Sequence, residues 1–319
     1  MKLGVMIEGQ EGLNWERWRA IMARVEDLGF ESLWRSDHFH SFISRDRDSL
    51  ETWVSLTLAA QETSRLRFGP LVCSMTFRHP SLLARMAAAV DQLSGGRLVL
   101  GVGAGWNERE HAAFGIPFPP VKQRMDMLED GIEVLLRLFA GGPASFEGGE
   151  YTLDRAVMLP SSAQRPHPPL LVGGGGERRT LRIVARYADE WNLPGATPER
   201  YREKAAVLER YCGGIGRDPA AIERSVMAAF LIGANSGDLQ RRAEAMLSLY
   251  PSMGTGGPEA LIEGARGRGW IVGTPDQAVA QLRALAGVGV QRVMLQHHNQ
   301  MDFHALDLIA REVLPAVAA

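Results

Sequence analysis

The chain is poor in the features that mark secreted and membrane-spanning proteins. It has two cysteines in 319 residues, Cys73 and Cys212, too few for a disulfide framework. No segment approaches the roughly 20 consecutive apolar residues that a transmembrane helix needs. The N-terminal segment MKLGVMIEGQ turns polar too soon for a signal peptide. We therefore expect a cytoplasmic protein with no membrane partner.

Net charge is also low. The sequence has 35 basic and 37 acidic residues, a formal charge of -2, so nothing draws the chain as a whole toward nucleic acid. A hydrophobic content of 45% supplies enough apolar material for a large core. The expected partner is therefore a small-molecule substrate.

Short apolar runs alternate with longer segments of helical periodicity along the whole chain. Two helix starts are well marked, because Thr197-Pro198 and Thr274-Pro275 each place a capping hydroxyl before a first-turn proline. Alternation of strand and helix implies a parallel sheet, and eight such units predict a (β/α)8 TIM barrel, which needs about 250 residues. The predicted strands are 3–7, 32–35, 66–75, 97–103, 169–173, 189–193, 224–233 and 290–296.

The expected fold is thus α/β, with one barrel domain over residues 1–319 and two insertions. The first insertion, near 141–168, is rich in Gly, Pro and Ser around a hairpin candidate, SFEGGEYTL. The second, near 250–272, is expected to be loop-like with a little helix. An open doubly wound sheet is the alternative, but it normally has fewer strands and carries its nucleotide loop after the first one.

Catalytic groups of such a barrel lie at the carboxyl ends of its strands. Asp37 and His38 follow the second predicted strand and could form an acid–base pair, since a carboxylate can orient a histidine and raise its pKa. The alternative is a polar strand end, because adjacent residues point to opposite sides. His40 and His298 are weaker candidates. No spacing matches a zinc site or a facial triad, so no metal is expected.

Four glycines, Gly173 to Gly176 in LVGGGGERRT, lie between a predicted strand and a predicted helix. Backbone N–H groups at such a position bind anions, and glycine lets a phosphate approach closely. Arg178 and Arg179 could add positive charge. The alternative is a tight turn. The run is not a P-loop, because no Lys-Ser/Thr pair follows it.

A second glycine set, GVGAGW at 101–106, fails the dinucleotide fingerprint because Trp106 occupies the place of its last glycine. We expect its backbone to approach a flat ligand, with Trp106 and Asn107 at the ligand's edge; a packing role for Gly101 and Gly103 is the alternative. The following stretch, 107–111, is predicted to be an exposed helix start. Cys73 is predicted to be a small core residue.

Taken together, these segments resemble the bacterial luciferase superfamily, the luciferase-like flavin- and F420-dependent oxidoreductases. The resemblance runs almost end to end and is carried by residues 32–39, 65–118, 168–192 and 272–295. It implies a barrel that holds a flavin or deazaflavin ring in its C-terminal mouth, and it also suggests a homodimer.

The resemblance also implies residue roles. His38 matches the histidine near the hydride-transfer centre of F420-dependent dehydrogenases. Leu71 and Val72 match the place where the third strand bulges against the ring, often through a non-prolyl cis peptide. Cofactor contacts are implied for Asp37, Leu71, Val72, Asn107, Gly174, Gly175 and Gly176. From their places beside these residues, we expect Gly105, Trp106, Gly173 and Arg178 to contact the cofactor as well.

Two positions depart from the sugar-phosphate dehydrogenases of this superfamily. Trp106 stands in place of their catalytic glutamate, and Phe42 in place of a tryptophan. A sugar-phosphate substrate is therefore not expected, and the proton donor is left open, with Glu108 a candidate by proximity. The SDHF segment, and Arg178 and Arg179 as partners for an acidic cofactor tail, favour F420 over FMN.

The expected activity is hydride transfer between C5 of F420 and a small organic substrate that the sequence does not identify. One alternative is an FMN-dependent monooxygenase that uses O2 and flavin reduced by a separate reductase. Another is a non-catalytic flavin-binding barrel. A phosphosugar isomerase barrel would instead place its phosphate loop after strands seven and eight.

Overall fold

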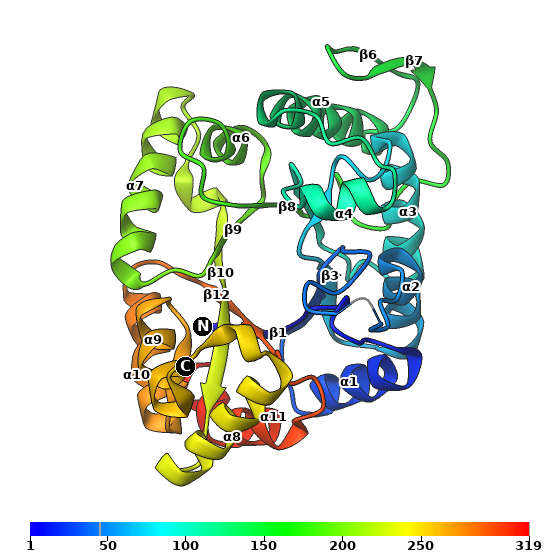
Figure 1. The fold of residues 1–319 in the computed structure, drawn as a ribbon. Helices are drawn as coiled ribbons and strands as arrows, with labels where there is room; N and C mark the ends of the chain where they lie inside the picture. The colour runs from blue at the N-terminus through cyan, green and yellow to red at the C-terminus, as the bar shows by residue number, and fades with distance from the viewer. Residues whose placement is uncertain (45, 319) are drawn as a thin grey trace.

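The computed structural model describes residues 1–44 and 46–318 and shows a (β/α)8 barrel, with helices around a ring of parallel strands (Figure 1). The strand order is β3-β2-β1-β12-β10-β9-β8-β5-β4. The barrel strands are β1 (Lys2–Ile7), β2 (Ser32–Arg35), β3 (Arg67–Pro70), β4 (Cys73–Ser74), β5 (Leu100–Gly103), β8 (Leu170–Gly173), β9 (Glu190–Pro194), β10 (Glu223–Ile232) and β12 (Arg292–Gln296).

The third predicted strand, 66–75, is not continuous. It divides into β3 and β4 at Leu71 and Val72, and the peptide bond between these two residues is cis. The resemblance implied this bond, whereas the apolar pattern of the segment gave no sign of the interruption. Both side chains line the cavity described below.

The ring closes where β3 and β5 approach each other. A Cβ atom on Gly69 would lie 2.0 Å from the Val99 carbonyl oxygen, and one on Gly101 would lie 2.1 Å from that of Pro70. Real Cβ atoms do not approach backbone so closely, so both glycines are required by packing. For Gly101 the packing role is therefore the correct one.

The helices surround the strands in chain order. Both predicted helix starts are present: Thr197 caps α7 by accepting from the N–H of Arg200, and Thr274 forms a capping box with Gln277. The helices are α1 (Trp15–Asp27), α2 (Thr52–Glu62), α3 (Pro80–Leu93), α4 (Glu108–Ala113), α5 (Val121–Phe139), α6 (Thr180–Tyr187), α7 (Pro198–Gly214), α8 (Ser236–Leu249), α9 (Gly257–Gly267), α10 (Pro275–Gly287), α11 (Phe303–Leu308) and α12 (Leu314–Val317).

The two insertion segments differ from each other. Residues 141–168 contain the expected hairpin, the antiparallel pair β6 (Ala144–Glu147) and β7 (Thr152–Ala156). The prediction that 250–272 is mostly loop was wrong, because the segment contains α9 and ends on β11 (Ile271–Gly273), which pairs with β10. Leu261, Ala265 and Val272 of this segment pack against α8, and this burial drives the order.

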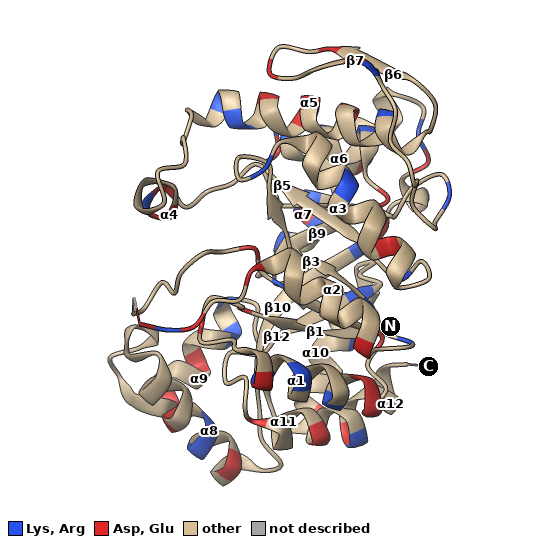
Figure 2. Ribbon diagram, turned by 90° about the vertical axis from the view of Figure 1, so that its right-hand side faces the viewer, with Lys and Arg blue, Asp and Glu red and all other residues tan. Residues whose placement is uncertain are grey.

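A cluster of ion pairs lies at the end of the barrel where the strands begin. Arg292 is buried at the start of β12 and forms ion pairs with Glu31, Glu190 and Glu223. Both chain termini lie at this end, and α4 lies at the other (Figure 2). The described helices include none long and apolar enough to cross a membrane. A ligand site is therefore expected at the opposite end, where the strands have their carboxyl ends.

Candidate functional site

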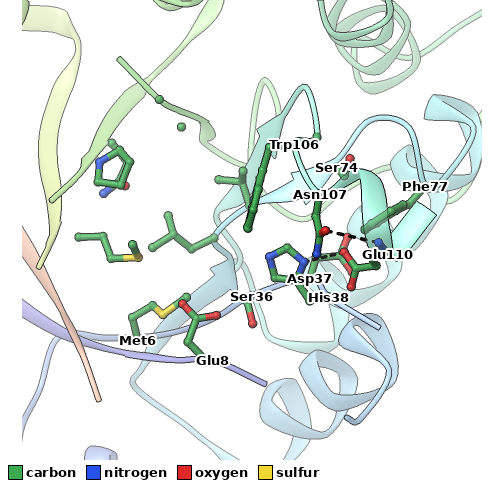
Figure 3. A pocket seen from close by; sticks show the side chains of 18 of the residues that line it. Met6, Glu8, Ser36, Asp37, His38, Ser74, Phe77, Trp106, Asn107 and Glu110 are labelled. Atoms are coloured by element: carbon green, nitrogen blue, oxygen red, sulfur yellow. Dashed lines mark hydrogen bonds and ion pairs between the residues drawn. The ribbon is translucent and has the colours of Figure 1, made fainter. Parts of the chain in front are cut away.

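A cavity of about 290 Å³ opens at the carboxyl ends of the barrel strands (Figure 3). Its walls are mostly apolar, with a few polar groups, as in most small-molecule sites. The sequence-predicted residues that line it are Asp37, His38, Leu71, Val72, Gly105, Trp106, Asn107, Gly173 and Gly174. Gly175, Gly176 and Arg178 do not line the cavity and continue the glycine loop beyond its edge.

His38 pairs with a carboxylate that sequence reasoning missed. Its Nδ1 lies 2.8 Å from Oε2 of Glu110 in α4, and the other oxygen of Glu110 accepts from the N–H of Phe39. Burial opposes the charge on His38, but the hydrogen bond and charge of Glu110 outweigh it and raise the pKa of His38. The imidazole can therefore hold a proton at the cavity wall.

Asp37 does not pair with His38, and that part of the prediction was wrong. It receives two hydrogen bonds from the Arg78 guanidinium, of 2.5 and 3.0 Å. Burial opposes the charge on Asp37, but Arg78 outweighs burial and lowers the pKa of Asp37. Arg78 also forms an ion pair with Glu51, the N-cap residue of α2, at 2.9 Å. Asp37 is therefore an ionised carboxylate whose charge is balanced, and whose position is fixed, by the guanidinium of Arg78.

Two aromatic rings enclose the His38 imidazole edge-on. The centroid of Phe42 lies 4.8 Å from that of His38, and the centroid of Trp106 lies 5.7 Å from it. Trp106 is 67% exposed, so it stands at the mouth of the cavity, whereas His38 lies deeper (Figure 3). The rings keep water from one side of the histidine and leave its Nε2 edge for a ligand.

Replacing Glu110 with Gln should lower the pKa of His38. The amide keeps the shape of the side chain but removes the charge that outweighs burial, so the imidazole should lose its proton at lower pH than in the wild type. The ¹³C and ¹⁵N NMR titration of His38 measures this directly. A pKa unchanged or raised in Glu110→Gln would contradict the assigned pair, and Glu108→Gln, on the exposed side of α4, is the charge-matched control.

A second polar chain forms part of the cavity wall. His111 places Nδ1 2.7 Å from the Asn107 carbonyl oxygen and Nε2 2.7 Å from Oγ1 of Thr76, which lies 2.6 Å from Oγ of Ser74. A carbonyl only accepts, so Nδ1 carries a proton and donates it to the Asn107 carbonyl oxygen. Thr76 thus links the ring of His111 to the hydroxyl of Ser74, which lines the cavity.

The start of α4 is therefore not the exposed helix start that the sequence predicted for 107–111. Asn107, Glu110 and His111 are all buried, and the Asn107 side chain caps the helix by accepting from the N–H of Glu110. Their spacing of three and four residues puts them on one helix face. That spacing could have indicated a buried helix face, but the many charged residues of the stretch favoured an exposed one.

The glycine loop has the backbone geometry of an anion cradle. Gly174 has φ of +120°, which side chains rarely adopt, and a Cβ on Gly175 would lie 2.6 Å from Cδ1 of Leu193. Among the described residues, the backbone N–H groups of Gly175, Gly176 and Glu177 have no acceptor. Three free donors just before α6 fit a phosphate group.

The two arginines after the glycines have different surroundings. Arg179 forms ion pairs with Asp126 at 2.6 Å and Glu129 at 3.2 Å in α5, so it is a structural link and not a free cation, contrary to prediction. Arg178 is exposed and forms no ion pair with the described residues. Only Arg178 is therefore free to meet an anion at this edge.

The weaker candidates do not join the site. His40 places Nδ1 2.9 Å from the Ser41 carbonyl oxygen, and His298 lines two other cavities but not this one. Glu108 is exposed and does not line the cavity. Cys73 is buried in the core, as predicted. Within the described residues, no cluster of His, Cys, Asp or Glu could hold a metal ion.

Glu8 is the other carboxylate that sequence reasoning missed. It follows β1 and lines the cavity on the side of Met6 (Figure 3). Its oxygens accept from the side-chain amides of Gln10, at 2.9 Å, and Gln296. The residue follows a predicted strand, which was a signal in principle, but a lone glutamate at that place has no distinguishing pattern.

Comparison with known proteins is consistent with this geometry. A similar curated protein is the F420-dependent hydroxymycolic acid dehydrogenase of Mycobacterium tuberculosis, 26% identical over 326 residues, covering 98% of this chain and 87% of the relative. Two solved structures share the fold. One is an F420-dependent secondary alcohol dehydrogenase in complex with an F420–acetone adduct, with a TM-score of 0.83, 21% identity and coverage of 99% of this chain and 98% of the other.

The second structure is a monooxygenase from Streptomyces bottropensis, with a TM-score of 0.83, 23% identity and coverage of 99% of both chains. Most directly, the family model for luciferase-like monooxygenases matches residues 1–292, which is most of the sequence. The barrel, the cavity at its carboxyl end and the matched length agree. The chain belongs to the luciferase-like monooxygenase family of oxidoreductases.

Proposed function

We propose that this protein is an F420-dependent oxidoreductase that transfers a hydride between C5 of the deazaflavin and a small organic substrate. The observation that carries the proposal is the placement of two features around one cavity. A glycine loop with free N–H donors follows β8, and the His38–Glu110 pair follows β2 on another part of the wall. A phosphate-bearing cofactor and a proton-transfer group would thus meet at one site.

The residues present fit such a cofactor. Gly175, Gly176 and Glu177 would hold its phosphate through backbone N–H groups, and Leu71 and Val72 would support one face of a flat ring. Asn107 and Ser74 present polar atoms at the wall. When bound, F420 supplies a hydride acceptor or donor at C5.

His38 would move the proton that accompanies the hydride. In the oxidation of an alcohol, the imidazole takes the hydroxyl proton as the hydride leaves the carbinol carbon; in the reverse direction it returns that proton to the carbonyl oxygen. Glu110 would orient the ring and stabilise its charged form, since it holds Nδ1 and leaves Nε2 for the substrate. The apolar walls would exclude water.

The choice of F420 is supported by the relative named an F420-dependent dehydrogenase, which is 26% identical over nearly the whole chain. Arg178, free at the loop's edge, is suited to the acidic tail that F420 carries beyond its phosphate and FMN lacks. The description of the matched family favours the alternative, an FMN-dependent monooxygenase supplied with reduced flavin by a separate reductase.

The test is a comparison of two assays on the purified protein. Anaerobic reduction of F420 by a panel of small alcohols supports the proposal if any member reacts. Oxygen uptake with supplied reduced FMN, together with no reaction of F420, would establish the monooxygenase instead. Absence of turnover with either cofactor, despite tight binding, would indicate a non-catalytic flavin-binding barrel.

We further propose that the protein is a cytoplasmic homodimer. The two cysteines are free and buried, which suits a reducing compartment. The neighbouring helices α2 and α3 expose Val54, Leu82 and Leu93, of which 55%, 58% and 50% respectively are accessible. Large apolar side chains gathered on adjacent helices mark an interaction surface, and a second copy of the chain would cover it.

Replacing Leu82 with Glu should therefore weaken the dimer, by about tenfold or more in dissociation constant, because a charge would be buried against the partner helix. Light scattering coupled to size-exclusion chromatography over a concentration series measures the effect. Ile215→Glu, a change at an equally exposed side chain (58%) at the end of α7, on the other side of the barrel from α2 and α3 (Figure 1), is the control. A wild-type protein that is monomeric at all concentrations would contradict the proposal.

A further inference from the structure

Glu8 is the one carboxylate of the cavity wall without a positive partner among the described residues. Asp37 is neutralised by Arg78, and Glu110 faces His38. The two neighbours of Glu8, Gln10 and Gln296, each contribute a single neutral N–H. No lysine or arginine lines the cavity within the described chain. Glu8 therefore has no ion-pair partner on the wall, and two carboxylates, Glu110 and Glu8, face the single imidazole of His38, whose pKa both raise against burial.

The orientation of Glu8 is fixed by the residues behind it. The N–H of Gly9 donates to Oγ of Ser36 at 2.9 Å, and the Ser36 hydroxyl donates to Oε1 of Gln10 at 2.6 Å. The amide nitrogen of Gln10 must then face Glu8. A carboxylate has about four lone-pair sites, and these contacts use two, so the rest can accept from a ligand.

Barrel order separates this charge from the glycine loop. The ring has eight positions when β3 and β4 are counted as one. Strand β1 is then four positions from β8 in either direction, so Glu8 and the glycine loop lie on opposite walls. At the loop Arg178 is free and Lys204 pairs with Glu177 at 2.7 Å, whereas on the β1 side Arg47 is already paired with Glu11 at 3.3 Å. His38 follows β2, next to β1. An anion is thus favoured at the loop and disfavoured beside His38.

We propose that the substrate is an apolar molecule whose polar group is a hydroxyl or an amine that donates to Glu8, and that it carries no phosphate or carboxylate. This rests on the proposed function only in taking the cavity beside His38 as the substrate site. The apolar remainder is set by Met6, Leu71, Phe42 and Met227, which line the same cavity. Glu8 acts as a specificity-determining residue through charge and hydrogen bonding.

Three probes that share one ring test the proposal: cyclohexylmethylamine, cyclohexylmethanol and cyclohexanecarboxylate. Their dissociation constants are measured by calorimetry on the F420-loaded protein and on the protein without cofactor. The amine and the alcohol should bind at least about tenfold more tightly than the carboxylate, since a charge a few ångströms away in a poorly screened cavity changes affinity by that order or more. Equal or tighter binding of the carboxylate would overturn the proposal.

Substitutions of Glu8 test whether this residue causes the preference for the amine and the alcohol over the carboxylate. Glu8→Gln should bring the amine and the carboxylate to within about threefold of each other, whereas Glu8→Asp, which keeps the charge, should retain the preference. Glu108→Gln removes the same charge at an exposed place outside the cavity and should change nothing. A preference that persists in a folded Glu8→Gln protein, or a Glu8→Gln effect confined to F420 affinity, would overturn the assignment.

The wild-type ratio decides the matter even if the Glu8 variants do not fold. Because the protein without cofactor has no hydride acceptor and cannot turn the probes over, their order can also be measured on it, even if F420 fails to bind. Loss of the charge preference would leave the oxidoreductase proposal intact, whereas loss of F420 binding would remove the oxidoreductase proposal and leave the probe order as measured. The two failures are thus distinguishable.

Discussion

His38→Ala should lower kcat by about 10²- to 10⁴-fold, the range that a positioned acid–base group contributes. The F420 dissociation constant should change little, because His38 lies on a different part of the wall from the glycine loop. The rate is measured as anaerobic reduction of F420 by an alcohol that the wild type oxidises. A loss in kcat with binding preserved separates proton transfer from cofactor positioning.

His40→Ala is the matched control for this prediction. His40 lies two residues away, hydrogen-bonds the Ser41 carbonyl and does not line the cavity, so its replacement should leave kcat nearly unchanged. Turnover that survives undiminished in His38→Ala would contradict the role given to His38. It would also favour a barrel in which the cofactor binds but this histidine does no chemistry.

Gly175→Val should weaken cofactor binding by about tenfold or more. A Cβ at this position would lie 2.6 Å from Cδ1 of Leu193, so the loop must shift and the N–H groups of Gly175 and Gly176 lose their convergence. Overpacking of this kind costs about 1–3 kcal/mol, equivalent to roughly 5- to 150-fold in an equilibrium constant. Titration of F420 into the variant, followed by absorption, gives the change.

The control is Gly213→Ala in α7, where an added Cβ meets no atom within 4 Å. That change should leave cofactor affinity as it is and, by removing a glycine from a helix, should not destabilise the fold. Circular dichroism melts of both variants separate loss of binding from loss of folding. A folded Gly175→Val protein that binds F420 as tightly as the wild type does would contradict the phosphate cradle.

The sequence predicted the barrel because strand and helix patterns are local. The apolar run 3–7 matches β1 within one residue, and the caps at Thr197 and Thr274 mark real helix starts. Segment 250–272 was missed because its helix is glycine-rich and β11 is three residues long, too short for a periodic signal. Its order comes from burial against α8, which only the fold provides.

The sequence predicted the site residues that directly follow strands. It did not predict their partners, which come from distant parts of the chain. His38 and Glu110 are 72 residues apart, and Asp37 and Arg78 are 41 apart. Adjacency in sequence suggested an Asp37–His38 pair, but successive residues at a strand end point to opposite sides, and each found its partner elsewhere. Which carboxylate meets which cation is set by the packing of α4 and the β4–α3 connection against the β2 loop.

Charges of opposite sign lie on opposite sides of the mouth of the barrel. Free positive charge lies at the glycine loop, and the carboxylate of Glu8, which has no ion-pair partner among the described residues, lies across the barrel. With the phosphate of a cofactor at the loop, the reactive ring would point toward His38 and the substrate would lie toward Glu8. On the proposal above, this arrangement of charge disfavours a phosphate-bearing substrate beside His38.

The most direct test of the account is a parallel titration of the purified protein with F420 and with FMN, followed by absorption and calorimetry. The account predicts saturable binding of F420, with FMN at least about tenfold weaker, because FMN has no acidic tail for Arg178 to meet. Tight binding of FMN with no binding of F420 would contradict it and would leave the monooxygenase as the function of this barrel.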